Sequence, residues 1–187
     1  MENFLSCSRI LYDKDILEKA KEISDLKKII SVLIKDSDNE RLFKLGNECL
    51  ENKQIDEAMY FFKEAINKEN PNYIYYSYIG RCYSYKKMWE KSIFYHTKAL
   101  ELCDDVFLPY IGLAQSYFGM KNYDKSIQTC NELLKIKPDK KDIYIILGGL
   151  YLITGQEKDA YNIYKKANEL FPRENYFIKI LSDFKDI

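Results

Sequence analysis

The sequence predicts an all-α solenoid built from four helix pairs. The main observation is a self-similarity with a period of 34 residues in this chain of 187 residues. Small residues recur at that interval, each preceded by an aliphatic one: Gly46, Gly80, Ala114 and Gly148. A repeat of about 20–50 residues indicates a solenoid, because one such unit cannot bury its apolar face alone and must stack on its neighbours.

The spacing within each unit is the second observation, and it predicts two helices per unit. The unit that begins at Asn39 has two apolar stripes at helical spacing. The first stripe consists of Leu42, Leu45, Gly46 and Cys49, and the second of Ala58, Phe62 and Ala65. The small residues allow two helices to approach closely. Pro138 and Pro172 end the second helices of the last two units, since proline cannot continue a helix.

This pattern resembles the tetratricopeptide repeat family over residues 39–174, where the family's marks recur in register in four units. The units are 39–72, 73–106, 107–140 and 141–174. Departures are few: leucine or tyrosine replaces the first tryptophan, and Glu157 stands where an aromatic residue is usual. The resemblance implies antiparallel helix pairs stacked into a right-handed superhelix with a concave groove. It also implies a non-catalytic, protein-binding role.

The two ends of the chain differ from the repeats. Residues 175–187 predict a capping helix, with Tyr176, Phe177, Ile180, Leu181 and Phe184 on one face. Residues 1–38 are helical in pattern but lack the 34-residue marks. This N-terminal segment could cover the first unit as a cap, dock a partner or a second copy, or form an atypical extra repeat.

The resemblance implies that set positions on each first helix line the groove. The expected partner-binding residues are Phe43, Asn47, Arg81, Tyr85, Leu108, Ile111, Gln115, Phe118, Ile145, Leu152 and Ile153. The second half of this set is almost wholly apolar, and an exposed apolar patch of that size usually binds something. We therefore expect a protein or peptide partner with an apolar or amphipathic segment. The alternative is that the N-terminal helix or a second copy fills the groove.

Family members that bind the acidic C-terminal tails of chaperones hold them with lysine, asparagine and arginine at five groove positions. Counted from the first unit, those positions hold Phe43, Asn47, Tyr78, Leu108 and Gly112. Counted from the second unit, they hold Ser77, Arg81, Gly112, Asp142 and Ile146. Neither set supplies the cations that would pair with two carboxylates. The sequence therefore predicts no binding to such tails.

Composition excludes several classes of function. Lysine plus arginine equals aspartate plus glutamate, at 29 each, which argues against a nucleic-acid binder. Five cysteines without a Cys-x-x-Cys pair indicate reduced thiols in the cytoplasm or nucleus. The start of the chain lacks a signal-peptide pattern. The most apolar stretch, 143–154, is far shorter than the roughly 20 residues that span a bilayer, so no membrane insertion is expected.

No residue pattern indicates catalysis, a metal site or a cofactor. His96 is the only histidine and occupies the stripe position of Phe62, so we expect a packed ring with one satisfied nitrogen. Cys49 and Cys130 fall on core stripes, and Cys103, near a turn, is expected to be the most exposed thiol. Glycine-rich phosphate loops and nucleophile elbows are absent from the sequence.

The function predicted from the sequence is a non-catalytic interaction module that binds a partner segment in its groove. The alternative is a structural subunit of a larger complex, or a homodimer, that makes contact through its end faces. The stretch Leu108–Leu113 is similar to part of a repeat subunit of the anaphase-promoting complex, which is one case of that alternative.

Overall fold

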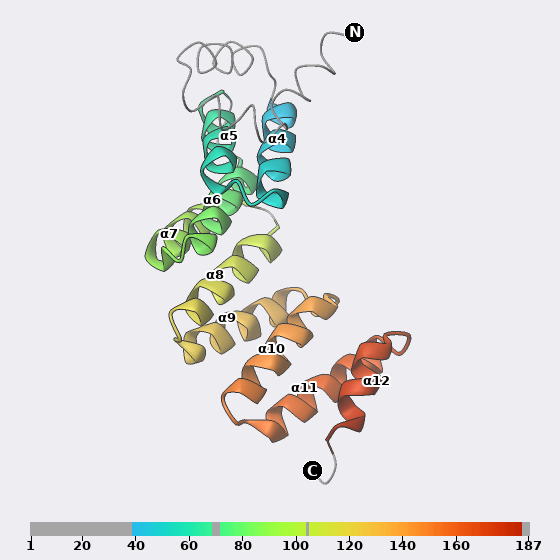
Figure 1. The fold of residues 1–187 in the computed structure, drawn as a ribbon. Helices are drawn as coiled ribbons and strands as arrows, with labels where there is room; N and C mark the ends of the chain where they lie inside the picture. Colours follow the sequence, from blue (N-terminus) through green and yellow to red (C-terminus); the bar gives the residue numbers. More distant parts are fainter. Residues whose placement is uncertain (1–38, 69–71, 104, 185–187) are drawn as a thin grey trace.

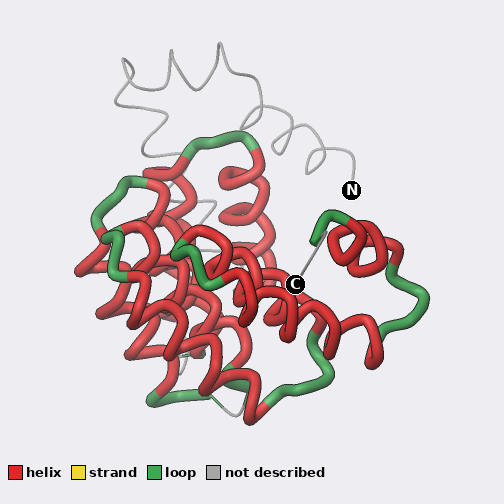
Figure 2. The backbone as a smooth tube through the Cα atoms, turned by 90° about the horizontal axis from the view of Figure 1, so that it is seen from below, coloured by secondary structure: helices red, strands yellow, loops and turns green. Residues whose placement is uncertain are grey.

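The computed structural model describes residues 39–68, 72–103 and 105–184, and the predicted N-terminal segment 1–38 lies outside them. Within these ranges every regular element is a helix (Figure 2). The helices form one elongated stack with α4 and α5 at one end and α11 and α12 at the other (Figure 1). The all-α fold class predicted from the sequence is therefore confirmed.

First and second helices alternate along the chain, and consecutive first helices begin 34 residues apart. The first helices are α4 (Asn39–Glu51), α6 (Tyr73–Tyr85), α8 (Phe107–Gly119) and α10 (Lys141–Ile153). The second helices are α5 (Ile55–Lys68), α7 (Trp89–Leu100), α9 (Tyr123–Ile136) and α11 (Glu157–Leu170). The final helix is α12 (Asn175–Ser182). Each helix packs on the next one along the chain, which gives the stack its core.

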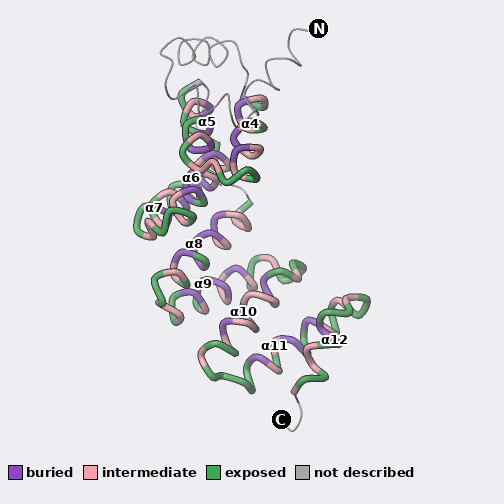
Figure 3. Tube along the Cα trace, viewed as in Figure 1, coloured by how far each residue is buried: buried purple, intermediate pink, exposed green. Residues whose placement is uncertain are grey.

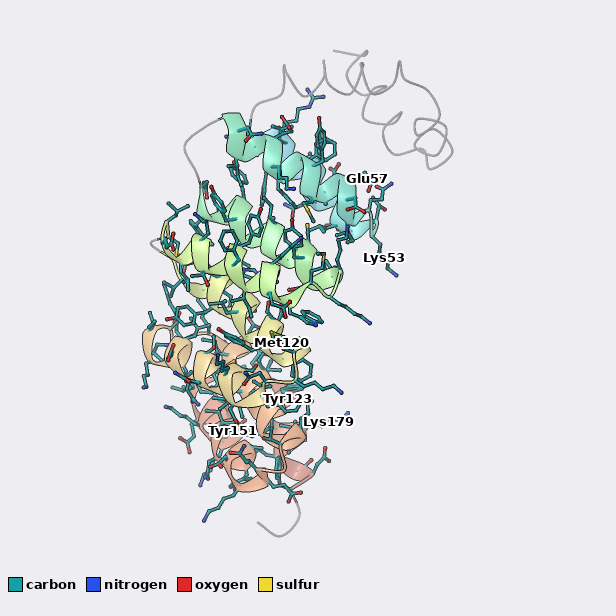
Figure 4. The ribbon with its side chains drawn as sticks, turned by 90° about the vertical axis from the view of Figure 1, so that its left-hand side faces the viewer. Lys53, Glu57, Met120, Tyr123, Tyr151 and Lys179 are labelled. Atoms are coloured by element: carbon teal, nitrogen blue, oxygen red, sulfur yellow. The ribbon has the colours of Figure 1, made fainter. Side chains whose placement is uncertain are left out.

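Each first helix ends in the same tight turn. At the first turn the backbone N–H of Gln54 donates to the carbonyl of Cys49 at 2.8 Å, and that of Lys53 donates to Leu50 at 3.0 Å. This pair of bonds defines a Schellman motif, which requires a left-handed residue just past the helix end. The left-handed residues are Lys53, Lys87, Lys121 and Gly155, all with positive φ. Figure 4 labels Lys53 at the first of these turns, and Met120 and Tyr123 at the third.

Within each pair, a small residue on the first helix faces a larger one on the second. A Cβ added at Gly46 would lie 2.5 Å from the ring of Phe62, so only glycine leaves room for that ring. Gly80 faces His96 in the same way. The third pair has Ala114 and the smaller Cys130, both buried at the equivalent positions. The small and large residues that recur in the sequence therefore match one another across the helix pairs.

Buried residues occur along the whole stack (Figure 3), and they form three apolar clusters. One cluster, around Leu42, Phe62 and Ile79, joins α4 to α7. A second cluster, around Leu133 and Leu147, joins α8 to α11. The cluster at the α12 end, around Tyr164 and Phe177, joins α10, α11 and α12. Every unit therefore shares its core with a neighbour, as a solenoid requires.

The last helix covers the end of the stack, but it is shorter than predicted. Phe177 is fully buried against Tyr164, with ring centroids 6.4 Å apart. The helix ends at Ser182, where the N–H groups of Asp183 and Phe184 bond three residues back and tighten the last turn. Tyr176 is 44% exposed, although the sequence placed it on the packed face.

Candidate partner-binding surface

The predicted groove face is closed where α6 meets α8. These two first helices approach each other more closely than α8 and α10 do. Ser77, which the family pattern places in the groove, is only 1% exposed. A Cβ added at Gly112 would overlap the ring of His96, so glycine lets α8 approach α7 and α6 closely. Small side chains therefore remove this part of the groove.

Three serines join the same junction through hydrogen bonds. Ser92 Oγ lies 2.7 Å from Ser84 Oγ and 2.7 Å from Ser116 Oγ. Ser116 also donates to the backbone carbonyl of Gly112 at 2.7 Å. These residues come from α6, α7 and α8, so the network ties the second unit to the third. Such pairing favours burial of the three hydroxyl groups, because an unpaired one would lose its hydrogen bonds to water.

An apolar hollow opens between α8 and α10, with a volume of about 210 Å³. Its lining is mostly aliphatic and aromatic: Ala114, Gln115, Phe118, Ser126, Ile145, Ile146, Gly149, Leu150 and Ile153. We call this feature the α8–α10 hollow. It is smaller than the roughly 300–1,000 Å³ of pockets that hold drug-sized ligands. Its size and lining suit a single large apolar side chain.

The rim of the hollow remains in contact with solvent. Phe118 is 42% exposed and Ile153 is 57% exposed, although both side chains are apolar. The Phe118 ring rests against Tyr123, with centroids 5.7 Å apart, which fixes it at the edge of the opening. An exposed apolar rim around an apolar hollow is typical of a binding site.

Four of the predicted site residues line the hollow, and the others lie elsewhere. Gln115, Phe118, Ile145 and Ile153 are in its wall. The remaining residues with exposed side chains are Arg81, Tyr85 and Leu152, and those that are half-buried are Phe43, Asn47, Leu108 and Ile111. The structure therefore brings together one part of the predicted set, at the third and fourth units.

Phe43 is held in an aromatic cluster at the first unit. Its ring centroid lies 4.9 Å from that of Tyr78 in an edge-to-face arrangement and 5.9 Å from that of Phe62. Such contacts stabilise the packing of α4 on α6. This half-buried ring packs within the fold, although the sequence placed it on the binding surface.

Arg81 forms a second feature of the groove face, on α6. Its Nε and Nη2 atoms donate to Tyr85 Oη at 3.2 and 3.0 Å. The guanidinium also lies 5.6 Å from the centroid of the Tyr85 ring and 5.9 Å from that of Tyr78. None of the ion pairs within the described ranges includes Arg81. The two tyrosines therefore hold an exposed cation in place.

Gly149 lines the hollow but was absent from the predicted set. A Cβ added there would meet no atom of the described residues within 4 Å, whereas one added at the neighbouring Gly148 would overlap the Tyr164 ring. The missing side chain at Gly149 thus leaves part of the hollow empty. The signal in the sequence was its register, because Gly149 occupies the same unit position as Arg81 and Gln115.

His96 is buried as predicted, but its ring does not form the predicted hydrogen bond. The ring is 2% exposed, and neither Nδ1 nor Nε2 has a hydrogen-bond partner among the residues that the structure describes. The expectation of one satisfied nitrogen is therefore wrong. Gly80 and Gly112 on either side offer no side chain that could accept or donate. Burial lowers the pKa of His96 to about 4.

Across residues 39–68, 72–103 and 105–184, no group of three or more potential metal-ligating side chains comes together. No helix in those ranges is long and apolar enough to cross a membrane.

Alkylation by iodoacetamide at neutral pH is expected to modify Cys103 far faster than Cys49, Cys82 or Cys130. The last three thiols are buried, and burial raises the pKa of each to about 12. Because the thiolate is the nucleophile, we expect a rate difference of at least about tenfold in the folded protein. Mass spectrometry of the digested protein measures this difference. Equal rates in the folded protein, as expected only after denaturation in urea, would contradict the packing described above.

Comparison with known proteins supports the same architecture. The sequence model of the tetratricopeptide repeat matches residues 109–140 and 142–174. A TPR repeat-containing protein of Methanocaldococcus jannaschii is 29% identical over 96 residues, which cover 51% of this chain and 17% of that protein. The Hsp70-Hsp90 organising protein of Plasmodium falciparum is 22% identical over 111 residues, which cover 59% of this chain and 44% of that protein. The chain thus spans less than half the length of these relatives.

Solved structures give the same fold at low sequence identity. The crystal structure of MamA superposes with a TM-score of 0.65 at 23% identity, covering 86% of this chain and 96% of MamA. A chain of the APC/C hetero-tetramer Cut9-Hcn1 superposes with a TM-score of 0.64 at 16% identity, and the match covers 79% of the present chain and 30% of the Cut9-Hcn1 chain. The tetratricopeptide repeat model thus matches the third and fourth units of this chain, and the solved structures, together with the repeated helix pairs, show the fold of a tetratricopeptide-repeat solenoid.

Proposed function

We propose that this protein is a non-catalytic scaffold that binds a segment of a protein partner at the α8–α10 hollow. Tetratricopeptide-repeat proteins act as protein-interaction scaffolds, and the hollow supplies a specific place for contact. The observation that carries the proposal is the combination of an apolar cavity with the exposed rim residues Phe118 and Ile153. Burying that rim under an apolar side chain would release water from both surfaces.

A substitution at the rim tests this proposal. Phe118→Glu places a charge at the opening of the hollow, so partners retained by the wild-type protein from an extract of its own cells should be lost. Phe94→Glu is the matched control, because Phe94 is 54% exposed on the second helix α7, away from the hollow. Retention of the same partners by Phe118→Glu and by the control would contradict binding at the hollow.

A second candidate function is a structural subunit or homodimer that makes contact through its end face. Tyr176 and Ile178 on α12 are 44% and 52% exposed at the end of the stack, which supports this alternative. The fold also matches a chain of the APC/C hetero-tetramer. Light scattering separates the two functions, because Ile178→Glu would lower the mass of an end-face dimer and Phe118→Glu would not.

Acidic C-terminal tails of chaperones are not the partners that we propose, although one relative is named as an Hsp70-Hsp90 organising protein. Of the five positions counted from the second unit, Ser77 and Gly112 lie in the closed junction. Asp142 is exposed and carries the wrong charge for a carboxylate ligand.

Free thiols at the four described cysteines support a reducing compartment, the cytoplasm or the nucleus.

A further inference from the structure

We infer that the partner segment is extended and carries one acidic side chain for Arg81 in addition to the apolar side chain that enters the hollow. This inference rests on the proposed function and specifies the chemistry of its partner. Three observations support it: three residues share one position in consecutive repeats, two tyrosines hold the Arg81 guanidinium at the surface, and the hollow admits one side chain.

Arg81, Gln115 and Gly149 occupy the same position in three consecutive first helices, 34 residues apart. They therefore form a row that runs across α6, α8 and α10. Gln115 and Gly149 line the hollow at one end of the row, and Arg81 lies at the other end. A segment laid along this row would meet a cation, an amide and an apolar opening in that order.

Arg81 is prepared for an anionic ligand. Its Nε and Nη2 bonds to Tyr85 Oη, together with the two tyrosine rings, fix the guanidinium at the surface and leave the Nη1 N–H groups available. Among the groove positions of the second and third units, Arg81 is the one charged residue. An arginine held in this way forms strong, directional hydrogen bonds to a carboxylate.

The spacing of the two subsites defines the partner further. Packed helices such as α6 and α8 lie about 8–10 Å apart, and α8 and α10, which approach each other less closely, lie at least that far apart, so Arg81 and Gly149 are separated by about 20 Å. An extended chain advances about 3.3 Å per residue, which places the acidic and apolar side chains about six residues apart. The hollow of about 210 Å³ admits one side chain, which fits an extended segment better than the continuous ridge of a helix.

Selection from a library of random 12-residue peptides displayed on phage tests this inference with the full chain. The wild-type protein, Arg81→Glu, Gly149→Leu and the control Phe94→Glu are used in parallel, and thermal melts establish that each is folded. Gly149→Leu fills the hollow from a position with open space around it. We expect the wild type and the control to enrich peptides with an acidic and a large apolar residue about six positions apart.

Arg81→Glu should reverse the preference at the acidic position towards lysine and arginine. A synthetic peptide of the enriched sequence should bind it at least about tenfold more weakly, as expected for loss of a charge-assisted hydrogen bond. Enriched peptides that lack an acidic residue and bind Arg81→Glu equally well would overturn this inference alone. Equal enrichment by Gly149→Leu and the wild type would instead overturn binding at the hollow, and with it the proposed function.

Discussion

Gly148→Ala is expected to destabilise the protein, whereas Gly149→Ala, one residue further along α10, should stabilise it. A Cβ at Gly148 would overlap the ring of Tyr164, which is 1% exposed and packed against Phe177. Because the ring has no space to move into, we expect overpacking to lower the free energy of unfolding by about 2 kcal/mol or more. The measurement is urea denaturation followed by circular dichroism.

Gly149→Ala is the matched control for that experiment. Its Cβ would meet no atom within 4 Å, so only the helix propensity of the backbone changes. Alanine favours a helix interior over glycine by about 1 kcal/mol, and the free energy of unfolding should rise by that amount. Equal effects of the two substitutions would show that Tyr164 does not pack against Gly148.

Acidification from pH 6.5 to pH 4 is expected to destabilise the protein through His96. Burial lowers the pKa of His96 from 6.5 to about 4, so the unfolded chain takes up a proton in this range and the folded chain does not. Stability is therefore fully present above pH 6.5, falls as the pH decreases, and levels off below pH 4. At about 1.4 kcal/mol for each pH unit between the two pKa values, the loss approaches about 3 kcal/mol.

Denaturation of the wild type and of His96→Phe across this pH range measures that contribution. Phenylalanine occupies the equivalent position in the first unit, as Phe62, and carries no titrating group. Carboxylates contribute equally to both proteins, so the difference between their slopes reports His96. Equal slopes would mean that His96 gains a proton as easily in the folded protein as in the unfolded chain.

The helices were predictable because their signals are local and repeated. The small and apolar residues that recur in four units predicted the first and second helices. Pro138 and Pro172 predicted where α9 and α11 end. The glycines that recur within the helix pairs were predicted for the same reason, since Gly46 and Gly80 lie opposite large residues. Gly112, which lies outside that recurring position, was not predicted as a close-approach glycine. The length of α12 differed from the prediction, because its last turn tightens and the helix ends at Ser182.

The lining of the α8–α10 hollow was predictable only in part. Register identified Gln115, Phe118, Ile145 and Ile153, which line the hollow. The same criterion, position within the repeat, also predicted Phe43 as a binding residue, but its ring packs against Tyr78 within the fold. Position in a repeat gives the direction in which a side chain points, but the neighbouring helix determines whether that side chain remains accessible.

The sequence by itself determined the helix pairs, their order and the face that each first helix turns towards the groove. The tertiary structure decided where that groove is open. It is closed between α6 and α8, where Gly112 receives the ring of His96 and serines bond across the junction. It is open between α8 and α10, where no atom of the described residues lies within 4 Å of a Cβ built at Gly149. The physical reason is that periodicity within a helix sets its faces, whereas the distance between two helices depends on matched side-chain volumes contributed by different units.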